Sequence, residues 1–299
     1  MPQFISHPLI KPDTIESRIY QEVLAARVLE MGNSLVVAPT ALGKTVVAVL
    51  VAAHRLQENK GSKIIFLAPT KPLAVQHLKS FSNFMVPEFG KSAVLTGTTS
   101  AKERKKAWDE NTFISATPQT VENDLIGGRL KLTDVSLVIF DEAHRAVGDY
   151  AYVFIAQRYI SQCKNPLILA LTASPGGEQQ HIQDVCKNLF IKNVEIKSTE
   201  DADVKPYANP IEMEWVKVDL PPKFMEAKKH LEDYMREQLV FLKKLGYART
   251  INTRLLGKRQ MLELQSKIRR DLSTKASSMP SLWVAVSRSA ALLKVSHAH

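Results

Sequence analysis

The residues best suited to chemistry form the run APTALGKT, residues 38–45. The run follows a short apolar stretch, 35–37, and leads into a stretch with helical periodicity, 46–56. A strand, a tight loop and a helix start are the setting in which Gly-Lys-Thr binds phosphate, because loop N–H groups and the helix N-terminus face the anion. Lys44 adds a positive charge, and the Thr45 hydroxyl suits Mg²⁺. The predicted nucleotide-phosphate residues are Pro39, Thr40, Ala41, Leu42, Gly43, Lys44 and Thr45.

This loop departs from the usual G-x-x-x-x-G-K-[ST] pattern in two ways. Its first position is Ala38, and Ala41 also stands where a glycine would accept a positive φ. If Ala41 had to adopt a positive φ, the cost would be roughly 1–2 kcal/mol. We therefore expect a stiffer or slightly displaced loop that keeps its lysine, its threonine and its amides.

A second set of chemical groups is the sequence DEAH, residues 141–144, directly after the apolar stretch 137–140. Asp141 is suited to hold Mg²⁺ through water, and Glu142 to act as the general base that polarises an attacking water. We expect His144 to act as a hydrogen-bonded coupler, because no second His or Cys stands at metal-ligand spacing. A phosphate loop followed by an acidic strand end is the pattern of a nucleotide hydrolase.

Apolar stretches that alternate with helical stretches must position these groups. Near-continuous apolar strands separated by helices predict an α/β fold with a parallel sheet covered on both faces. Ligands of such sheets bind beyond the carboxyl ends of the strands, where the chemical groups fall. The predicted strands are residues 35–38, 64–68, 93–96, 113–116, 137–140, 167–171 and 194–196. The predicted helices lie near residues 14–30, 45–57, 72–84, 101–109, 118–126, 149–161 and 178–189.

The sequence changes character near residue 201. Alternating apolar residues predict a strand within 211–220, and residues 224–245 follow the period of a long amphipathic helix that Gly246 would end. Further helices are predicted at 251–272 and 282–295, with a connector at 273–280. The chain stops inside the last helix, so we expect a truncation there. The predicted organisation is a domain at 1–200, a connecting strand at 201–220 and an incomplete helical domain at 221–299.

The charge is distributed unevenly. The chain carries a formal net charge of +10, and residues 221–299 hold 16 Lys and Arg against 6 Asp and Glu. A phosphate backbone is the partner that such a basic region most often meets, and a solvated helical surface is the alternative. The side chains expected to contact nucleic acid in this region are Lys258, Arg259, Arg269 and Arg270.

Composition limits the remaining classes. Two cysteines without metal-ligand spacing favour a reducing cytoplasm, with the protein associated with the nucleoid. No signal peptide is visible, and no apolar run approaches the ~20 residues of a membrane span. Trp108, Trp215 and Trp283 are expected in the core rather than on a base-stacking surface.

Several short motifs resemble those of superfamily-two helicases, in the same order along residues 18–174. DEAH resembles the second motif and TAS at 172–174 the third, which couples hydrolysis to movement. APTKPL at 68–73, TG at 96–97 and ATPQT at 116–120 resemble the nucleic-acid motifs Ia, Ib and Ic, and RIYQ at 18–21 resembles the adenine-reading Q motif. The residues that this resemblance implies are Arg18 and Gln21 for ATP, Thr172 and Ser174 for coupling, and Thr70, Lys71, Gly97, Thr117 and Gln119 for nucleic acid.

Thr70 and Thr117 also have a simpler interpretation. Each precedes a predicted helix, where a threonine often caps the helix through its side chain. Free N–H groups at the same helix start could instead bind backbone phosphate without reading bases.

Within this superfamily the chain resembles the archaeal Hef helicase–nucleases and their Fanconi-anaemia M-type relatives. The phrases that carry this resemblance are LAPTKPL (67–73), ATPQTVENDL (116–125), FDEAHRAV (140–147) and YAYVFI (150–155). The resemblance implies a RecA-like P-loop domain that uses ATP and Mg²⁺, followed by the start of an inserted helical domain. It implies an ATP-dependent helicase or translocase for forked or branched DNA in repair or stalled-fork processing. The family's second motor domain and nuclease region do not follow, so the isolated chain is expected to be catalytically incomplete.

Two alternatives remain open from the sequence. The Dicer and RIG-I-like group shares a helical insert but binds double-stranded RNA; an alanine rather than that group's usual cysteine at the third DEAH position favours DNA. The chain could also be a nucleotide- and DNA-binding module without turnover.

Overall fold

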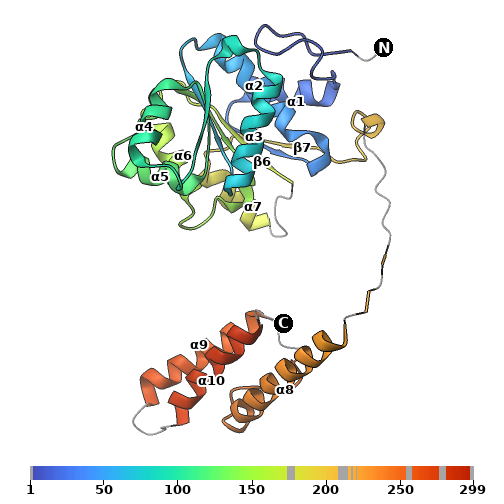
Figure 1. Cartoon of the computed structure of the whole chain (residues 1–299), viewed down its shortest axis with the longest axis vertical. Coiled ribbons are helices and arrows are strands. Elements are labelled where there is room, and N and C mark those ends of the chain that lie inside the picture. Colours follow the sequence, from blue (N-terminus) through green and yellow to red (C-terminus); the bar gives the residue numbers. More distant parts are fainter. Residues whose placement is uncertain are drawn as a thin grey trace. The chain divides into compact units, whose positions relative to one another are not determined.

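The computed structural model describes residues 3–173, 179–207, 215–216, 218–219, 221–253, 258–275 and 281–296. The chain forms two compact units, Met1–Ile211 and Glu212–His299 (Figure 1). The division between them falls inside the stretch 201–220 that was predicted to connect two domains.

Unit 1 is built on a seven-stranded parallel sheet, as predicted, with the order β3-β4-β2-β5-β6-β1-β7. Each predicted strand forms within one or two residues of its expected bounds. The strands are β1 (Ser34–Val37), β2 (Lys63–Leu67), β3 (Ser92–Leu95), β4 (Phe113–Ala116), β5 (Val135–Phe140), β6 (Ile168–Thr172) and β7 (Asn193–Ile196).

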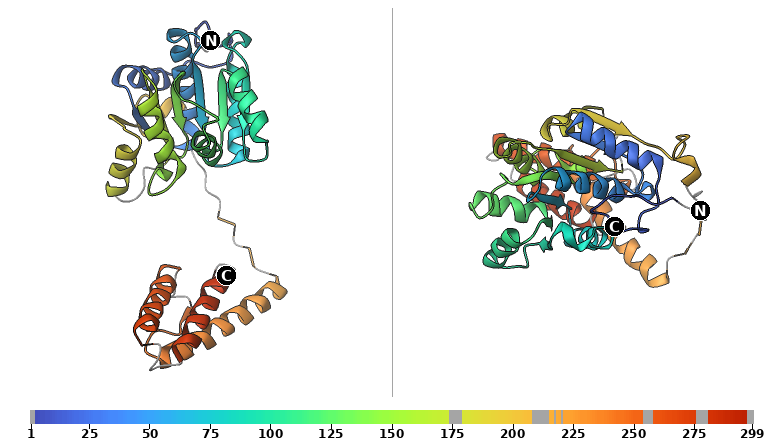
Figure 2. Two further views of the ribbon diagram at one scale, coloured as in Figure 1. Left: turned by 90° about the vertical axis from the view of Figure 1, so that its left-hand side faces the viewer. Right: turned by 90° about the horizontal axis from the view of Figure 1, so that it is seen from above.

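Helices cover both faces of this sheet (Figures 1 and 2). Successive residues of the strands point to opposite faces, so Phe66 packs into one apolar core and Leu67 into the other. The first core contains α1 (Ile19–Met31), α2 (Lys44–Glu58) and α3 (Lys71–Phe84). The second contains α4 (Ala101–Glu110), α5 (Pro118–Ile126), α6 (Ala151–Gln162) and α7 (Gln179–Asn188). The predicted α/β, RecA-like fold is therefore confirmed.

The first helix begins later than predicted. Residues 14–18 are not helical, because Glu16 pairs with Phe4 in an antiparallel bridge and Ile5 N–H donates to the Ile15 carbonyl (2.9 Å). Ile15 is buried as the apolar pattern required, but it is buried from a non-helical segment. The apolar spacing identified the buried side chain but predicted the wrong backbone conformation.

Unit 2 contains α8 (Pro222–Lys244), α9 (Lys258–Lys275) and α10 (Ser281–Ser296). Their core includes Leu239, Ile268 and Ala285. Gly246 takes a φ of 80° directly after α8, as its predicted role as a stop requires. The second helix was predicted at 251–272; residues 251–253 are not part of α9, and 254–257 lie outside the described residues. Helix α9 extends into the predicted connector 273–280, of which 276–280 also lie outside the described residues.

Other predictions for the C-terminal part fare less well. The predicted strand at 211–220 lies largely outside the described residues, and positions 215–216 and 218–219 form no regular structure. Trp108 is buried as expected, but Trp215 and Trp283 are 90% and 64% exposed, so their assignment to the core was wrong. None of the helices in the described ranges combines the length and apolar content that crossing a bilayer requires.

Candidate nucleotide site and nucleic-acid interface

The phosphate-loop candidate lies between β1 and α2. A 3₁₀ turn holds Thr40–Leu42, and Gly43 follows in the left-handed region (φ 68°, ψ 41°) directly before α2, whose first turn contains Lys44 and Thr45. Ala41 is not at positive φ. The strain considered from the sequence does not arise, because only Gly43 takes the conformation that disfavours a Cβ.

Helix α1 holds the loop from one side. The Tyr20 hydroxyl and the Gln21 side-chain amide both donate to the Leu42 carbonyl (3.1 Å each). A Cβ added at Gly43 would lie 2.5 Å from Gln21 Nε2, so the glycine permits this close approach. Gln21 is buried against the loop, which is where a residue linking the adenine region to the phosphates would lie.

Arg18, the other predicted adenine residue, is the N-cap of α1. Its guanidinium lies 5.2 Å from the centre of the Tyr207 ring and 3.3 Å from the Glu16 carboxylate. A hydrogen bond with Tyr20 and the pairing with Glu16 raise the pKa of Arg18, although its partial burial opposes them. Sequence reasoning missed Tyr207, because no motif surrounds it and its approach to α1 depends on the chain after β7.

The loop lysine faces the acidic strand end. Lys44 Nζ donates to the Ala38 carbonyl (2.7 Å), so the side chain folds back over its own loop. Burial lowers the pKa of Lys44, while the negative charges of Asp141 and Glu142 partly oppose that shift. The predicted phosphate ligand and both predicted carboxylates therefore share one site.

The residues after β5 are held in an unusual conformation. Glu142 has φ 51° and ψ 48°, a left-handed geometry that costs a non-glycine residue energy and is concentrated at functional sites. His144 Nδ1 lies 3.3 Å from Glu142 Oε2 and 3.1 Å from Thr172 Oγ1. The structure thus brings the DEAH segment together with Thr172 at the end of β6, while Ser174 lies outside the described residues.

Two residues that sequence reasoning missed hold Asp141. His77 of α3 places its Nε2 3.0 Å from Asp141 Oδ2. The buried Tyr152 hydroxyl of α6 contacts the carbonyls of Asp141 (2.6 Å) and Leu67 (3.1 Å). Burial, followed by the nearby Tyr150 and Asp141, raises the pKa of Tyr152 well above its usual value, so the hydroxyl remains a donor. Tyr152 lies within the phrase YAYVFI, but nothing in the sequence pairs His77 with Asp141.

The donor set of this site fits Mg²⁺. Thr45 and Asp141 offer oxygen ligands, and Mg²⁺ commonly uses one or two protein oxygens together with substrate phosphates and water. No cluster of three or more His, Cys, Asp or Glu suited to a metal occurs in the described part of the chain. ATP fits as well, because no side chain caps the start of α2 and Lys44 lies in its first turn.

Three further loops lie side by side at the same sheet edge, after the adjacent strands β3, β4 and β2. Thr70 and Thr117 are the N-caps of α3 and α5, yet neither side chain caps its helix. The Thr117 hydroxyl instead contacts Thr120 (2.8 Å), and Lys71 Nζ donates to Thr98 Oγ1 (3.1 Å). The simple capping interpretation of the two threonines is therefore not supported. Thr70, Lys71, Gly97 and Gln119 are exposed, and Thr117 is half-buried.

A buried ion cluster links helix α5 to the loop after β3. Both guanidinium nitrogens Nε and Nη2 of Arg104 donate to the fully buried Asp124 carboxylate (2.6 and 2.7 Å), and Arg104 Nη1 donates to the Thr99 carbonyl. Arg129 Nε donates to Asp124 as well (2.6 Å). The cluster connects the loop after β3 to α5. It was not predicted, because Arg104 and Asp124 are 20 positions apart and no sequence pattern pairs them.

Comparison with known families agrees with this geometry. The family model described as "DEAD/DEAH box helicase" matches residues 18–182, which contain the phosphate loop, the DEAH segment and Thr172. The chain belongs to the DEAD/DEAH box helicase family.

Individual relatives extend the match beyond the family model. The crystal structure of the Pyrococcus furiosus Hef helicase domain is 43% identical, with a TM-score of 0.68, over 97% of this chain and 61% of that one. A Methanocaldococcus jannaschii protein, provisionally named an ATP-dependent RNA helicase, is 38% identical over 89% of this chain and 33% of its own length. The ATP-dependent DNA helicase MPH1 of Pyricularia oryzae is 32% identical over 81% of this chain and 23% of its own length. The predicted resemblance to the Hef and Fanconi anemia M group is confirmed. The chain spans about a third or less of these two curated relatives.

The basic region of this helicase chain lies in unit 2. Lys258 and Arg259 fall in the first turn of α9, and their side chains lie outside the described residues. Arg269 and Arg270 are exposed on the same helix. Two of the four predicted contacts therefore lie on an accessible helix surface.

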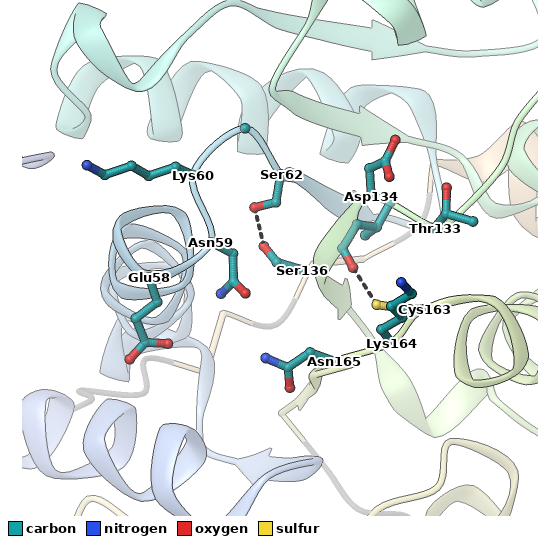
Figure 3. A pocket seen from close by; sticks show the side chains of 12 residues that line it. Glu58, Asn59, Lys60, Ser62, Thr133, Asp134, Ser136, Cys163, Lys164 and Asn165 are labelled. Carbon is teal, nitrogen blue, oxygen red and sulfur yellow. Dashed lines mark hydrogen bonds between the residues drawn. The ribbon is translucent and has the colours of Figure 1, made fainter.

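A cavity of about 470 Å³ opens away from these motifs, where β2, β5 and β6 begin (Figure 3). Its polar groups bond to one another: the Ser62 and Ser136 hydroxyls lie 2.7 Å apart, and Cys163 Sγ donates to the Val135 carbonyl. The buried Arg55 donates to the Ser136 and Asn165 carbonyls beside it. These contacts stabilise the strand starts, and the helicase motifs all lie at the opposite edge.

Proposed function

We propose that the chain is the ATP-binding motor domain, with the first part of a helical insert, of an ATP-dependent DNA helicase or translocase. Its substrate would be forked or branched DNA in repair or stalled-fork processing. Within this proposal residues 1–200 form the motor domain, 201–220 connect and 221–299 begin the insert. The observation that carries it is the arrangement of the phosphate loop after β1, Asp141 and Glu142 after β5, and Thr172 at the end of β6, because these strands are neighbours in one parallel sheet and their carboxyl ends share one edge.

The roles of the residues follow from their chemistry. The loop N–H groups and Lys44 would bind the β- and γ-phosphates, with Lys44 Nζ exchanging the Ala38 carbonyl for phosphate oxygen. Thr45 and Asp141 would hold Mg²⁺, which neutralises charge on the phosphates when bound. Glu142 would orient the attacking water and accept its proton, and His144 would link Glu142 to Thr172.

DNA is the favoured nucleic acid because MPH1 is named a DNA helicase. The uncapped starts of α3 and α5, with Lys71 beside them, suit backbone phosphates in a row. Such contacts fix a strand in place without reading its bases, as a motor that moves along DNA requires.

The resemblance to the Hef group implies that arginines of a second motor domain complete the ATP site. An arginine that stabilises the transferring phosphoryl group is worth roughly 10³–10⁵ in rate. On this basis the present chain binds ATP and hydrolyses it near the background rate.

The test measures ATP binding by residues 1–299 and by three variants. Lys44→Ala should abolish binding, Glu142→Gln should retain it, and Lys60→Ala, an exposed lysine at the opposite sheet edge, is the control. Wild-type affinity in Lys44→Ala would remove the phosphate-loop assignment.

The substrate is tested in a chain extended by a second motor domain. ATPase stimulation by forked DNA should exceed stimulation by duplex RNA. Stronger stimulation by the RNA would instead favour the dsRNA-dependent alternative, in keeping with the provisional name of the M. jannaschii relative.

A further inference from the structure

His77 is a buried polar residue that no helicase motif explains. It lies in α3, is 7% exposed, and stacks on the Phe66 ring with centroids 4.0 Å apart and planes 26° apart. Its Nε2 lies 3.0 Å from Asp141 Oδ2, and the side chain of Asp141 is itself only 13% exposed. The contact therefore lies between two largely desolvated groups.

The second ring nitrogen of His77, Nδ1, indicates which polar contact of the residue matters. Nδ1 of His77 is buried and has no hydrogen-bond partner among the described residues. An apolar side chain would fill this space beside Phe66 without leaving a polar atom unpaired, and an unpaired buried polar atom carries a cost. The polar function of His77 is therefore concentrated in its bond to Asp141. Because an ionised carboxylate only accepts, Nε2 carries the hydrogen and donates.

The contact also fixes the orientation of the carboxylate. The backbone of Asp141 is held by its own N–H bond to the Leu67 carbonyl (2.9 Å) and by the Tyr152 hydroxyl on its carbonyl. Neither contact controls rotation of the carboxylate about its side-chain bonds. The bond from His77 to Oδ2 does, and it leaves the second oxygen, Oδ1, for a metal or its water.

We propose that His77 is a positioning residue that orients the Asp141 carboxylate for Mg²⁺ when nucleotide binds. This rests on the proposed function, since it assigns Asp141 to the metal. Outer-shell partners of metal ligands typically change metal affinity by about 10–100-fold when removed. Asp141 would reach Mg²⁺ through water, so we expect the lower end of that range.

The experiment measures how Mg²⁺ strengthens ATP binding to residues 1–299. Fluorescent ATP is titrated in EDTA and then at increasing MgCl₂, and the Mg²⁺ concentration at half-maximal strengthening is recorded. His77→Phe keeps the ring beside Phe66 and removes the donor, so this concentration should rise about 10-fold. His77→Gln can restore an N–H donor near the place of Nε2, and should stay within about 3-fold of wild type. Affinity in EDTA should not change in either variant.

A control separates positioning from loss of stability. Phe81 lies on the same helix, stacks on Phe113 (4.1 Å) and has no polar side-chain group with which to hold a carboxylate. Phe81→Leu should lower the melting temperature and leave the Mg²⁺ requirement unchanged. His77→Phe with a wild-type Mg²⁺ requirement would overturn the proposal, as would an equal rise in Phe81→Leu. If wild-type protein bound ATP with no dependence on Mg²⁺, the proposed metal function of Asp141 would fail first, and the role of His77 with it.

Discussion

Replacing Asp124 with asparagine tests how much the buried ion cluster of Arg104, Asp124 and Arg129 contributes to the free energy of unfolding of unit 1. This cluster links the loop after β3 to α5. The Asp124 side chain is 1% exposed and the Arg104 side chain 11%, whereas Arg129 is 38% exposed. Asparagine has nearly the same shape, so the change removes charge and one acceptor without opening a cavity. The buried Arg104 guanidinium would then lack its counterion.

The magnitude follows from these exposures. Removing one partner of a buried ion pair typically costs about 3–5 kcal/mol, because the other charge stays buried and unpaired. Asparagine keeps one oxygen for Arg104, and Arg129 can turn towards solvent, so the lower end of about 3 kcal/mol is expected. Arg129→Gln, the control, should cost at most about 1 kcal/mol, as partly exposed pairs do.

The assay needs a reporter inside unit 1. Trp108 is buried in α4, the helix that carries Arg104, and Trp215 and Trp283 can be replaced with phenylalanine because both are exposed. With an m-value of about 2 kcal/mol/M in urea, Asp124→Asn should lower the midpoint of the Trp108 transition by about 1.5 M. A shift no larger than that of Arg129→Gln would refute the argument.

The same cluster predicts a pH dependence. Burial tends to raise the pKa of Asp124, but hydrogen bonds from Arg104 and Arg129 outweigh it and hold the pKa below its usual value. A lowered folded-state pKa gives stability that is complete above the unfolded value, near 3.9, and is lost as the pH falls through the folded value. The difference between wild type and Asp124→Asn should therefore shrink in acid, as urea midpoints measured down the pH scale would reveal.

Three further outcomes are expected. ATP affinity should weaken as the pH rises, beginning below the usual lysine value of 10.5, because burial lowers the pKa of Lys44 and phosphate binding needs its charge; a wild-type affinity that stayed constant up to pH 10.5 would contradict this. DNA affinity should fall as the salt concentration rises, because binding releases counterions. Changing Lys258, Arg259, Arg269 and Arg270 to glutamine should flatten the slope of log affinity against log salt. The expected change is up to about 0.9 for each phosphate that is no longer neutralised. Residues 1–299 as a verified monomer should hydrolyse ATP well below about 1 s⁻¹, the lower end of ordinary enzyme rates, even with forked DNA, and faster turnover would mean that an arginine of this chain completes the site.

The sequence predicted the sheet well because its strands are short, nearly continuous apolar runs. Such runs are typical of strands in a parallel sheet, where helices bury both faces of every strand. The motifs were predictable for a related reason: each is local, and the carboxyl ends of parallel strands bring local motifs to one edge. Lys44, Asp141 and Thr172 could therefore be expected at one site from the sequence alone.

The contacts that stabilise this site could not be predicted in the same way. The partners His77 and Asp141 are 64 positions apart, and their meeting depends on how α3 packs on the sheet. Backbone conformation was also missed where tertiary contacts override local pattern, as in the non-helical segment around Ile15. The exposure of Trp215 and Trp283 could not be predicted, because an apolar residue type does not establish that a partner element exists to bury the side chain.

The order of the strands places His77 between the loops proposed to bind DNA and the residues proposed to bind ATP. The loops proposed to meet DNA follow β3, β4 and β2, and the residues proposed to meet ATP follow β5, β6 and β1, so the two sets adjoin where β2 pairs with β5. Three contacts cross this junction at its carboxyl end: the Asp141 N–H bond to Leu67, the Tyr152 hydroxyl shared by the same two residues, and the bond from His77 to the Asp141 carboxylate. The first is a backbone hydrogen bond, and the second joins two backbone carbonyls through one side chain. The third joins the helix that starts at Lys71 to a side chain proposed to hold the metal. A displacement of α3 by a bound phosphate would therefore reach Asp141 through His77, and by thermodynamic reciprocity nucleotide with Mg²⁺ would act back on the affinity for DNA.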